Sequence, residues 1–121
     1  MSCGQNHANT KHEEQVIVNL SPKEFLASIE GKEVVLLDLR TPEELHGGII
    51  KGATHLDYFG DSFEEKLKNL NVKQSIFLYC QSGGRSGDAA EKLEKMGAAK
   101  VYNLDGGIES WEDVGLTLVA H

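Results

Sequence analysis

Two runs of apolar residues dominate the hydrophobic pattern of the chain, at 34–39 and 75–79. Both are rich in Val, Leu, Ile or aromatic side chains and lack the strict alternation of a half-exposed strand. Such runs are typical of strands that are buried on both faces of a parallel sheet. Shorter apolar runs at 16–18, 53–56 and 101–104 are further strand candidates.

Amphipathic segments separate these runs. Ser21, Pro22 and Glu24 make a capping box with proline at the first helical position, and 41–44 repeats the pattern, so each is expected to start a helix. Three apolar helix faces are predicted from Phe25, Leu26 and Ile29, from Phe63, Leu67 and Leu70, and from Ala89, Ala90, Leu93 and Met96. Strands that alternate with helices indicate an α/β fold with a parallel sheet.

The length of 121 residues suits one domain. Residues 1–14 are polar and show no periodicity, so they are expected to form a flexible tail, and 15–121 to form the folded domain. The net charge of -7 argues against a nucleic-acid partner, because phosphate binding needs a basic face. The two cysteines, Cys3 and Cys80, exclude a disulfide framework.

The apolar runs, such as 34–37, are far shorter than the roughly 20 residues that span a bilayer. No signal or transit peptide is visible, so the expected location is the cytoplasm. The alternative is a periplasmic lipoprotein anchored through Cys3. This alternative rests on the position of Cys3, which stands very early and precedes a polar tail, as in a mature lipoprotein whose signal peptide has been removed.

The segment 80–86, called loop 80–86 below, carries the chemistry-bearing residues. It follows a predicted buried strand and precedes a predicted helix, where ligands bind in open α/β sheets. Its glycines let backbone N–H groups point inward, and the helix N-terminus and the arginine add positive charge. A thiol held there should ionise readily and act as a nucleophile. The loop reads Cys80-Gln81-Ser82-Gly83-Gly84-Arg85-Ser86.

This loop resembles the Cys-x-x-Gly-x-Arg-Ser/Thr pattern of the rhodanese family of sulfurtransferases. Two flanking stretches are similar to other signatures of that family, in the same order and spacing. They are 37–44, which reads Leu-Asp-Leu-Arg-Thr-Pro-Glu-Glu, and 104–111, which reads Leu-Asp-Gly-Gly-Ile-Glu-Ser-Trp. The resemblance covers about residues 16–119. It implies a central parallel sheet of about five strands with helices on both faces.

The resemblance also implies residue roles. Cys80 would be the nucleophile and persulfide carrier, and the amides of 81–86 would hold the thiolate and the outer sulfur. Arg85 would bind an anionic donor such as thiosulfate, and Ser86 would cap the following helix and touch the sulfur. Asp38 and Arg40 are expected to brace the site. Residues 81–86 together are therefore the expected substrate-binding set: Gln81, Ser82, Gly83, Gly84, Arg85 and Ser86.

The expected reaction moves sulfane sulfur from the donor to Cys80 and then to cyanide, a small thiol or a protein thiol. No metal or organic cofactor is implied, and a monomer is expected. The chain departs from the family pattern at Ile49 and Lys51, where the family usually has His and Pro, and at Thr117, where Pro is common. These departures leave the Cys80 loop intact, and the changes at Ile49 and Lys51 are expected to alter the rim of the pocket or a partner surface.

Two other functions compete with sulfur transfer. Phosphatases and arsenate reductases use a loop of the form Cys-x5-Arg, whereas Cys80 and Arg85 are separated by four residues, which predicts a tighter ring. No aspartate is recognisable as a phosphatase general acid. The other alternative is a non-enzymatic rhodanese-like module used for binding or for carrying sulfur. The presence of Cys80 favours an active enzyme over that module.

Overall fold

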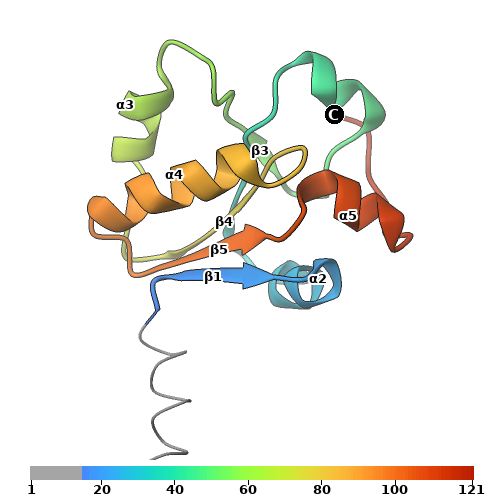
Figure 1. Cartoon of the computed structure of the whole chain (residues 1–121), viewed down its shortest axis with the longest axis horizontal. Helices are drawn as coiled ribbons and strands as arrows, with labels where there is room; N and C mark the ends of the chain where they lie inside the picture. Colours follow the sequence, from blue (N-terminus) through green and yellow to red (C-terminus); the bar gives the residue numbers. More distant parts are fainter. Residues whose placement is uncertain (1–14) are drawn as a thin grey trace, which may run out of the picture.

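Five parallel strands form one sheet in the computed structural model, which describes residues 15–121 (Figure 1). The strand order is β1-β5-β4-β2-β3, so the fold is α/β, as predicted. Each predicted strand is present, with ends that lie within two residues of those of the apolar runs. The strands are β1 (Ile17–Leu20), β2 (Val35–Asp38), β3 (Thr54–His55), β4 (Ser75–Tyr79) and β5 (Lys100–Leu104).

Helices cover both faces of the sheet. On one face, α3 (Phe63–Lys68) and α4 (Gly84–Lys95) pack against one apolar cluster. On the other face, α2 (Pro22–Ile29) and α5 (Gly107–Asp113) pack against a second cluster that contains Trp111. Figure 1 shows α4 lying along β4 and β5, and α5 and α2 at the right of the view, near the carboxyl ends of β5 and β1. The two clusters together bury the sheet, as the continuous apolar runs indicated.

The strand pair β2 and β4 occupies the centre of the sheet and fixes the geometry of the site. Asp38 pairs with Tyr79 in register, so β2 and β4 end side by side. Alternate residues of β4 enter the two clusters, with Ile76 and Leu78 in one and Phe77 in the other. The residues that follow these strands therefore emerge together at the carboxyl edge of the sheet.

The helix predicted after Thr41 is a 3-10 helix, η1 (Glu43–Gly47). Its start has the expected reciprocal bonds, because the Thr41 amide donates to Glu44 Oε1 over 2.9 Å and the Glu44 amide donates to Thr41 Oγ1 over 3.4 Å. The Glu44 carbonyl, however, accepts from Arg40 Nη1 at 2.9 Å, and Gly48 has a φ of 111°. The chain therefore turns away before an α-helix can form.

The predicted N-terminal tail and Cys3 lie outside the described residues. Within 15–121, no helix is long and apolar enough to cross a membrane.

Candidate active site

Loop 80–86 connects β4 to α4 at the carboxyl edge of the sheet. Cys80 directly follows Tyr79, and α4 begins at Gly84. Gly83 is the N-cap residue with a φ of 108°, a left-handed conformation that favours glycine. This turn wraps the chain around the cysteine, so the loop is placed as the sequence predicts.

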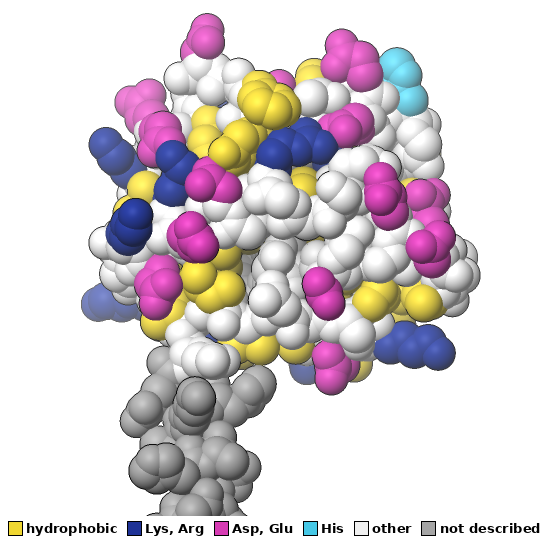
Figure 2. Space-filling view, viewed as in Figure 1, with side chains coloured by type: hydrophobic (Ala, Val, Ile, Leu, Met, Phe, Trp, Pro, Cys, Tyr) yellow, Lys and Arg dark blue, Asp and Glu magenta, His cyan; other side chains and the backbone are white. Residues whose placement is uncertain are grey.

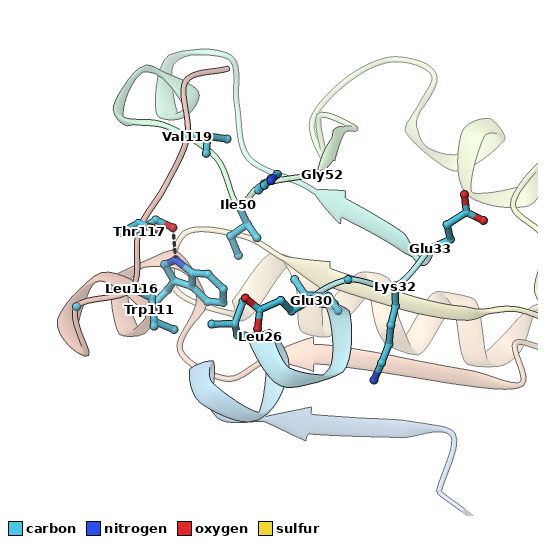
Figure 3. A pocket seen from close by; sticks show the side chains of 14 residues that line it. Leu26, Glu30, Lys32, Glu33, Ile50, Gly52, Trp111, Leu116, Thr117 and Val119 are labelled. Atoms are coloured by element: carbon cyan, nitrogen blue, oxygen red, sulfur yellow. Dashed lines mark hydrogen bonds between the residues drawn. The ribbon is translucent and has the colours of Figure 1, made fainter.

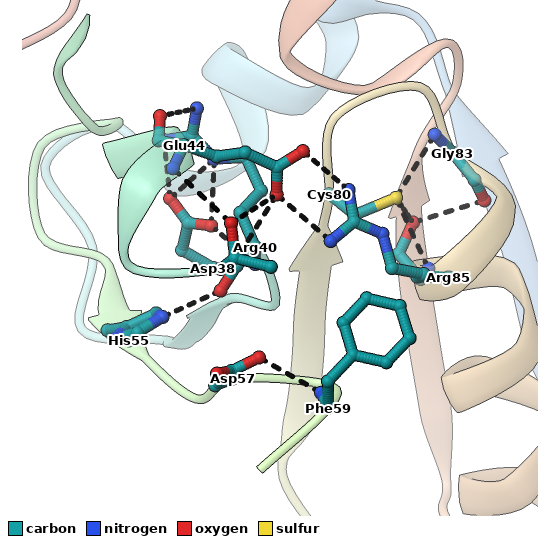
Figure 4. A network of polar contacts seen from close by, with 11 residues as sticks. Asp38, Arg40, Glu44, His55, Asp57, Phe59, Cys80, Gly83 and Arg85 are labelled. Atoms are coloured by element: carbon teal, nitrogen blue, oxygen red, sulfur yellow. Dashed lines mark hydrogen bonds and ion pairs between the residues drawn. The ribbon is translucent and has the colours of Figure 1, made fainter. Parts of the chain in front are cut away.

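The Cys80 sulfur lies at the centre of the loop and accepts several hydrogen bonds. The amides of Gly83 and Ser86 donate to Sγ at 3.1 and 3.4 Å, and the Ser86 hydroxyl donates at 3.5 Å (Figure 4). Cys80 is only 1% exposed, and this burial raises the pKa of its thiol. The hydrogen bonds from Ser86, Gly83 and the Ser82 amide outweigh burial, so the net pKa lies below that of an ordinary thiol.

Ser86 does not cap α4, contrary to the prediction from sequence. The cap position belongs to Gly83, which makes no side-chain cap bond, and Ser86 lies inside the first turn of the helix. Its hydroxyl is directed instead to Cys80 Sγ and to the Gly83 carbonyl, 3.3 Å away. The position that looked like a cap therefore contacts the sulfur directly.

Replacing Ser86 by alanine should raise the pKa of Cys80, because the Ser86 side chain gives the largest favourable hydrogen bond to the thiolate. At neutral pH, alkylation of Cys80 by iodoacetamide should slow severalfold in Ser86→Ala. The pH profile of the alkylation rate measures the change. Ser82→Ala is the matched control, since Ser82 acts through its amide and should leave the profile unchanged. Equal profiles for both variants would contradict this role of the hydroxyl.

Arg85 points to the neighbouring η1 helix, where it meets Glu44. Its Nη1 and Nη2 atoms donate to Oε1 and Oε2 of Glu44, each at 2.9 Å (Figure 4). The pair holds the pKa of Glu44 below its usual range and raises that of Arg85. The Phe59 ring lies against the guanidinium, with its centroid 5.5 Å from Cζ. Donor binding by Arg85 stays a prediction, and in this structure its terminal nitrogens are occupied.

Asp38 and Arg40 form a buried ion pair beside the loop. Their side chains are 1% and 3% exposed, and Arg40 Nη2 lies 2.8 Å from Asp38 Oδ2. Arg40 also donates to the carbonyls of Glu44 and Gly48, at 2.9 and 2.7 Å. Arg40 thus fixes the start and end of η1 against β2, which positions Glu44 to meet Arg85. The bracing role predicted for Asp38 and Arg40 agrees with these contacts.

The N-terminus of α5 supports the base of the loop. The amides of Ile108 and Glu109 donate to the carbonyls of Cys80 and Gln81, at 2.9 and 3.1 Å. Gly107 makes this approach close, because a Cβ atom there would lie 2.5 Å from the Gln81 carbonyl oxygen and 2.7 Å from that of Cys80. Gly107 also has a φ of 66°. The sequence indicated only a tight turn here, whereas the structure shows direct contact with the loop.

Gly107→Ala should destabilise the protein and displace the loop. The left-handed backbone at this position lowers the free energy of unfolding of an alanine variant by about 1 kcal/mol. The clash of Cβ with the backbone carbonyls lowers it by roughly a further 1–3 kcal/mol. Gly31→Ala is the matched control, since Gly31 has a similar φ of 72° and nothing within 4 Å of its Cβ position. Urea unfolding and the alkylation rate of Cys80 measure the two effects. A Gly107→Ala variant no less stable than Gly31→Ala would refute the close approach.

A pocket of about 640 Å³ lies away from the loop, between α2, Ile50 and the C-terminal segment (Figure 3). None of its lining residues belongs to loop 80–86. Two of the three departures from the family pattern, Lys51 and Thr117, line this pocket, and the Thr117 carbonyl accepts from Trp111 Nε1 at 3.0 Å. Ile49 exchanges two backbone hydrogen bonds of 2.8 Å with Val119. These departures therefore lie around the pocket or the C-terminal segment and leave the cysteine loop unchanged.

The sequence predicts only a capping role for Glu44 and does not predict its contact with Arg85. Glu44 belongs to the 37–44 motif, which marks it as a candidate for a role at the site. Its partner, Arg85, lies 41 residues further along the chain. Within the described residues, no three His, Cys, Asp or Glu side chains are grouped so that they could hold a metal ion.

Comparisons with known proteins agree with the fold. A family model described as the rhodanese-like domain matches residues 21–114. "Uncharacterized protein YqhL" of Bacillus subtilis is 32% identical over 104 residues, which cover 86% of this chain and 79% of that protein. Thiosulfate sulfurtransferase GlpE of Pseudomonas entomophila is 35% identical over 92 residues, which cover 76% and 82%.

A rhodanese-related protein of Thermoplasma volcanium has a solved structure similar to this one. The TM-score is 0.75 at 27% identity, with 86% of this chain and 99% of that chain covered. The family model spans four of the five strands, β2 to β5, and the three motifs. The chain therefore belongs to the rhodanese-like domain family.

Proposed function

We propose that this protein is a sulfurtransferase that carries sulfane sulfur as a persulfide on Cys80. The observation that supports the proposal most directly is the set of N–H and O–H groups that converge on Cys80 Sγ from Gly83 and Ser86. These donors stabilise the thiolate, which is the nucleophilic form of cysteine. The family relationship to a thiosulfate sulfurtransferase supports the same reaction class.

In the loading step, the Cys80 thiolate attacks the outer sulfur of thiosulfate. A bond forms between Sγ and that sulfur, the sulfur–sulfur bond of thiosulfate breaks, and its electron pair leaves with sulfite. The product is the anionic persulfide of Cys80. In the second step, cyanide or a thiolate attacks the outer sulfur, and the electron pair of the broken bond returns to Cys80 as thiolate. No proton, oxidant or reductant is consumed in transfer to cyanide.

The loop can stabilise the persulfide as well as the thiolate. The amides of Gly84 and Arg85 are the first two of α4, and the helix provides no carbonyl acceptor for them. The N-terminus of α4 also carries partial positive charge. These groups suit an outer sulfur atom that bears the negative charge after loading.

Intact mass spectrometry after thiosulfate treatment tests the proposal. The expected result is a mass gain of one sulfur atom, which disappears on addition of cyanide with release of thiocyanate. Absence of loading by any sulfane donor would favour the alternative of a binding module. Hydrolysis of a phosphate ester that depends on Cys80 would favour the phosphatase alternative and contradict the proposed reaction.

A further inference from the structure

We propose that Glu44 determines which donor charge the site prefers. Donors with one negative charge should load Cys80 better than dianions such as thiosulfate. The inference rests on the proposed function and names the donor class of the same site. The preferred class comprises monoanionic thiosulfonates and persulfides of uncharged thiols. Glu44 acts through Arg85 and through its own charge, as a specificity-determining residue that forms no bond to the sulfur.

The guanidinium group of Arg85 is already in contact with Glu44 and Phe59. The edge of its guanidinium that bears Nη1 and Nη2 faces the Glu44 carboxylate in a two-bond arrangement, and its Cζ atom lies over the Phe59 ring (Figure 4). A planar guanidinium binds a sulfonate through the same pair of donors that it offers a carboxylate. Glu44 therefore occupies the place that the sulfonate group of thiosulfate would take on Arg85.

The positive charges of the arginines near the loop are balanced by carboxylates. The chain has two arginines, Arg40 and Arg85, and each is matched by a carboxylate. The pair of Arg85 and Glu44 is close to neutral as a unit, and its side chains are 20% and 29% exposed. Arg85 lies close enough to Cys80 to interact with it electrostatically, and the Glu44 carboxylate offsets the charge of Arg85. An arriving anion thus meets little net attraction from these two arginines.

The charge of the whole protein acts in the same direction. The net charge is -7, and Figure 2 shows acidic side chains spread over the face in view. Repulsion from a fixed negative field grows in proportion to the charge of the arriving donor. A dianion is therefore opposed about twice as strongly as a monoanion of similar shape, by the general field and by Glu44 alike.

Thiosulfate and methanethiosulfonate form a matched donor pair for the experiment. Each presents a terminal sulfur on a tetrahedral sulfur centre, and one oxygen anion of thiosulfate is replaced by a methyl group. Attack by Cys80 on methanethiosulfonate gives the same persulfide, and the electron pair leaves with methanesulfinate. The measurement is kcat/KM of persulfide formation for each donor, obtained by rapid quenching and intact mass, in Glu44→Gln and in Glu43→Gln.

Glu44→Gln should raise kcat/KM for thiosulfate relative to methanethiosulfonate by roughly tenfold, the scale of one unit of charge across a partly exposed site. Glutamine can still accept the Thr41 amide bond, so η1 keeps its start. Glu43→Gln makes the same change in net charge on the neighbouring exposed side chain and should leave the donor ratio as in the wild type. Added salt should reduce the wild-type preference for the monoanion, since it screens the repulsion.

Two results would overturn the inference while leaving the proposed function in place. One is an equal change for both donors in Glu44→Gln, including an equal loss, which would indicate that Glu44 only braces the loop. The other is the same change of donor ratio in Glu43→Gln, which would indicate net charge alone. Failure of both donors to load the wild-type protein would refute the proposed function itself, and the inference with it.

Discussion

Cys80→Ser is expected to abolish persulfide formation and to leave the fold in place. Thiosulfate and methanethiosulfonate should then add no sulfur to the protein mass, because a serine hydroxyl is a far weaker nucleophile and stays protonated near neutral pH. Sulfur transfer to cyanide should fall to the rate of the uncatalysed reaction. Serine is close to cysteine in shape and can accept the bonds from Gly83 and Ser86, so the melting temperature should change little.

Cys3→Ser is the matched control, since Cys3 is the other cysteine of the chain. This variant should load one sulfur at the wild-type rate. A peptide map of the loaded wild-type protein should place the added sulfur on the segment that contains Cys80. Loading that survives in Cys80→Ser and disappears in Cys3→Ser would show that the reactive cysteine has been assigned wrongly.

The sheet and the place of the cysteine could be predicted from sequence because both depend on local patterns. The runs at 34–39 and 75–79 are apolar at consecutive positions, and consecutive residues of a strand point to opposite faces. Such runs therefore indicate strands that are buried on both faces. A glycine-rich segment between such a strand and an amphipathic helix falls at the carboxyl edge of the sheet. The strand order was not predicted, because it depends on how separate segments pair. In the structure β5 lies between β1 and β4.

The supports of the loop could not be predicted, because they join segments that are distant in sequence. Glu44 and Arg85 are 41 positions apart, and neither residue alone indicates that the other is its partner. The closeness of Gly107 to the Cys80 carbonyl likewise appears only when α5 is packed against the end of β4. The position of Ser86 near a helix start predicts both a cap and a contact with the sulfur, and only the contact is present in the structure.

Arg40 connects these separate supports, and its replacement should produce the largest loss of stability. Arg40→Met removes the partner of Asp38, whose side chain is 1% exposed, and leaves the carbonyls of Glu44 and Gly48 without their donor. Removing one member of a buried ion pair costs about 3–5 kcal/mol, because the remaining charge is buried without compensation. This is a large share of the roughly 5–15 kcal/mol that stabilises a typical domain. Urea unfolding measures the change.

Lys92→Met is the matched control for Arg40→Met, because it removes a cation from an exposed ion pair with the same replacement. Lys92 Nζ lies 2.6 Å from Glu64 Oε2, and the two side chains are 36% and 57% exposed. Water can solvate the Glu64 carboxylate once its partner is gone, so the urea midpoint should stay close to the wild-type value. The prediction for Arg40 is refuted if both variants unfold at the same urea concentration. It is supported if Arg40→Met alone unfolds early, because Arg40 is buried and bonded to two backbone carbonyls, whereas Lys92 is partly exposed and pairs with an exposed carboxylate.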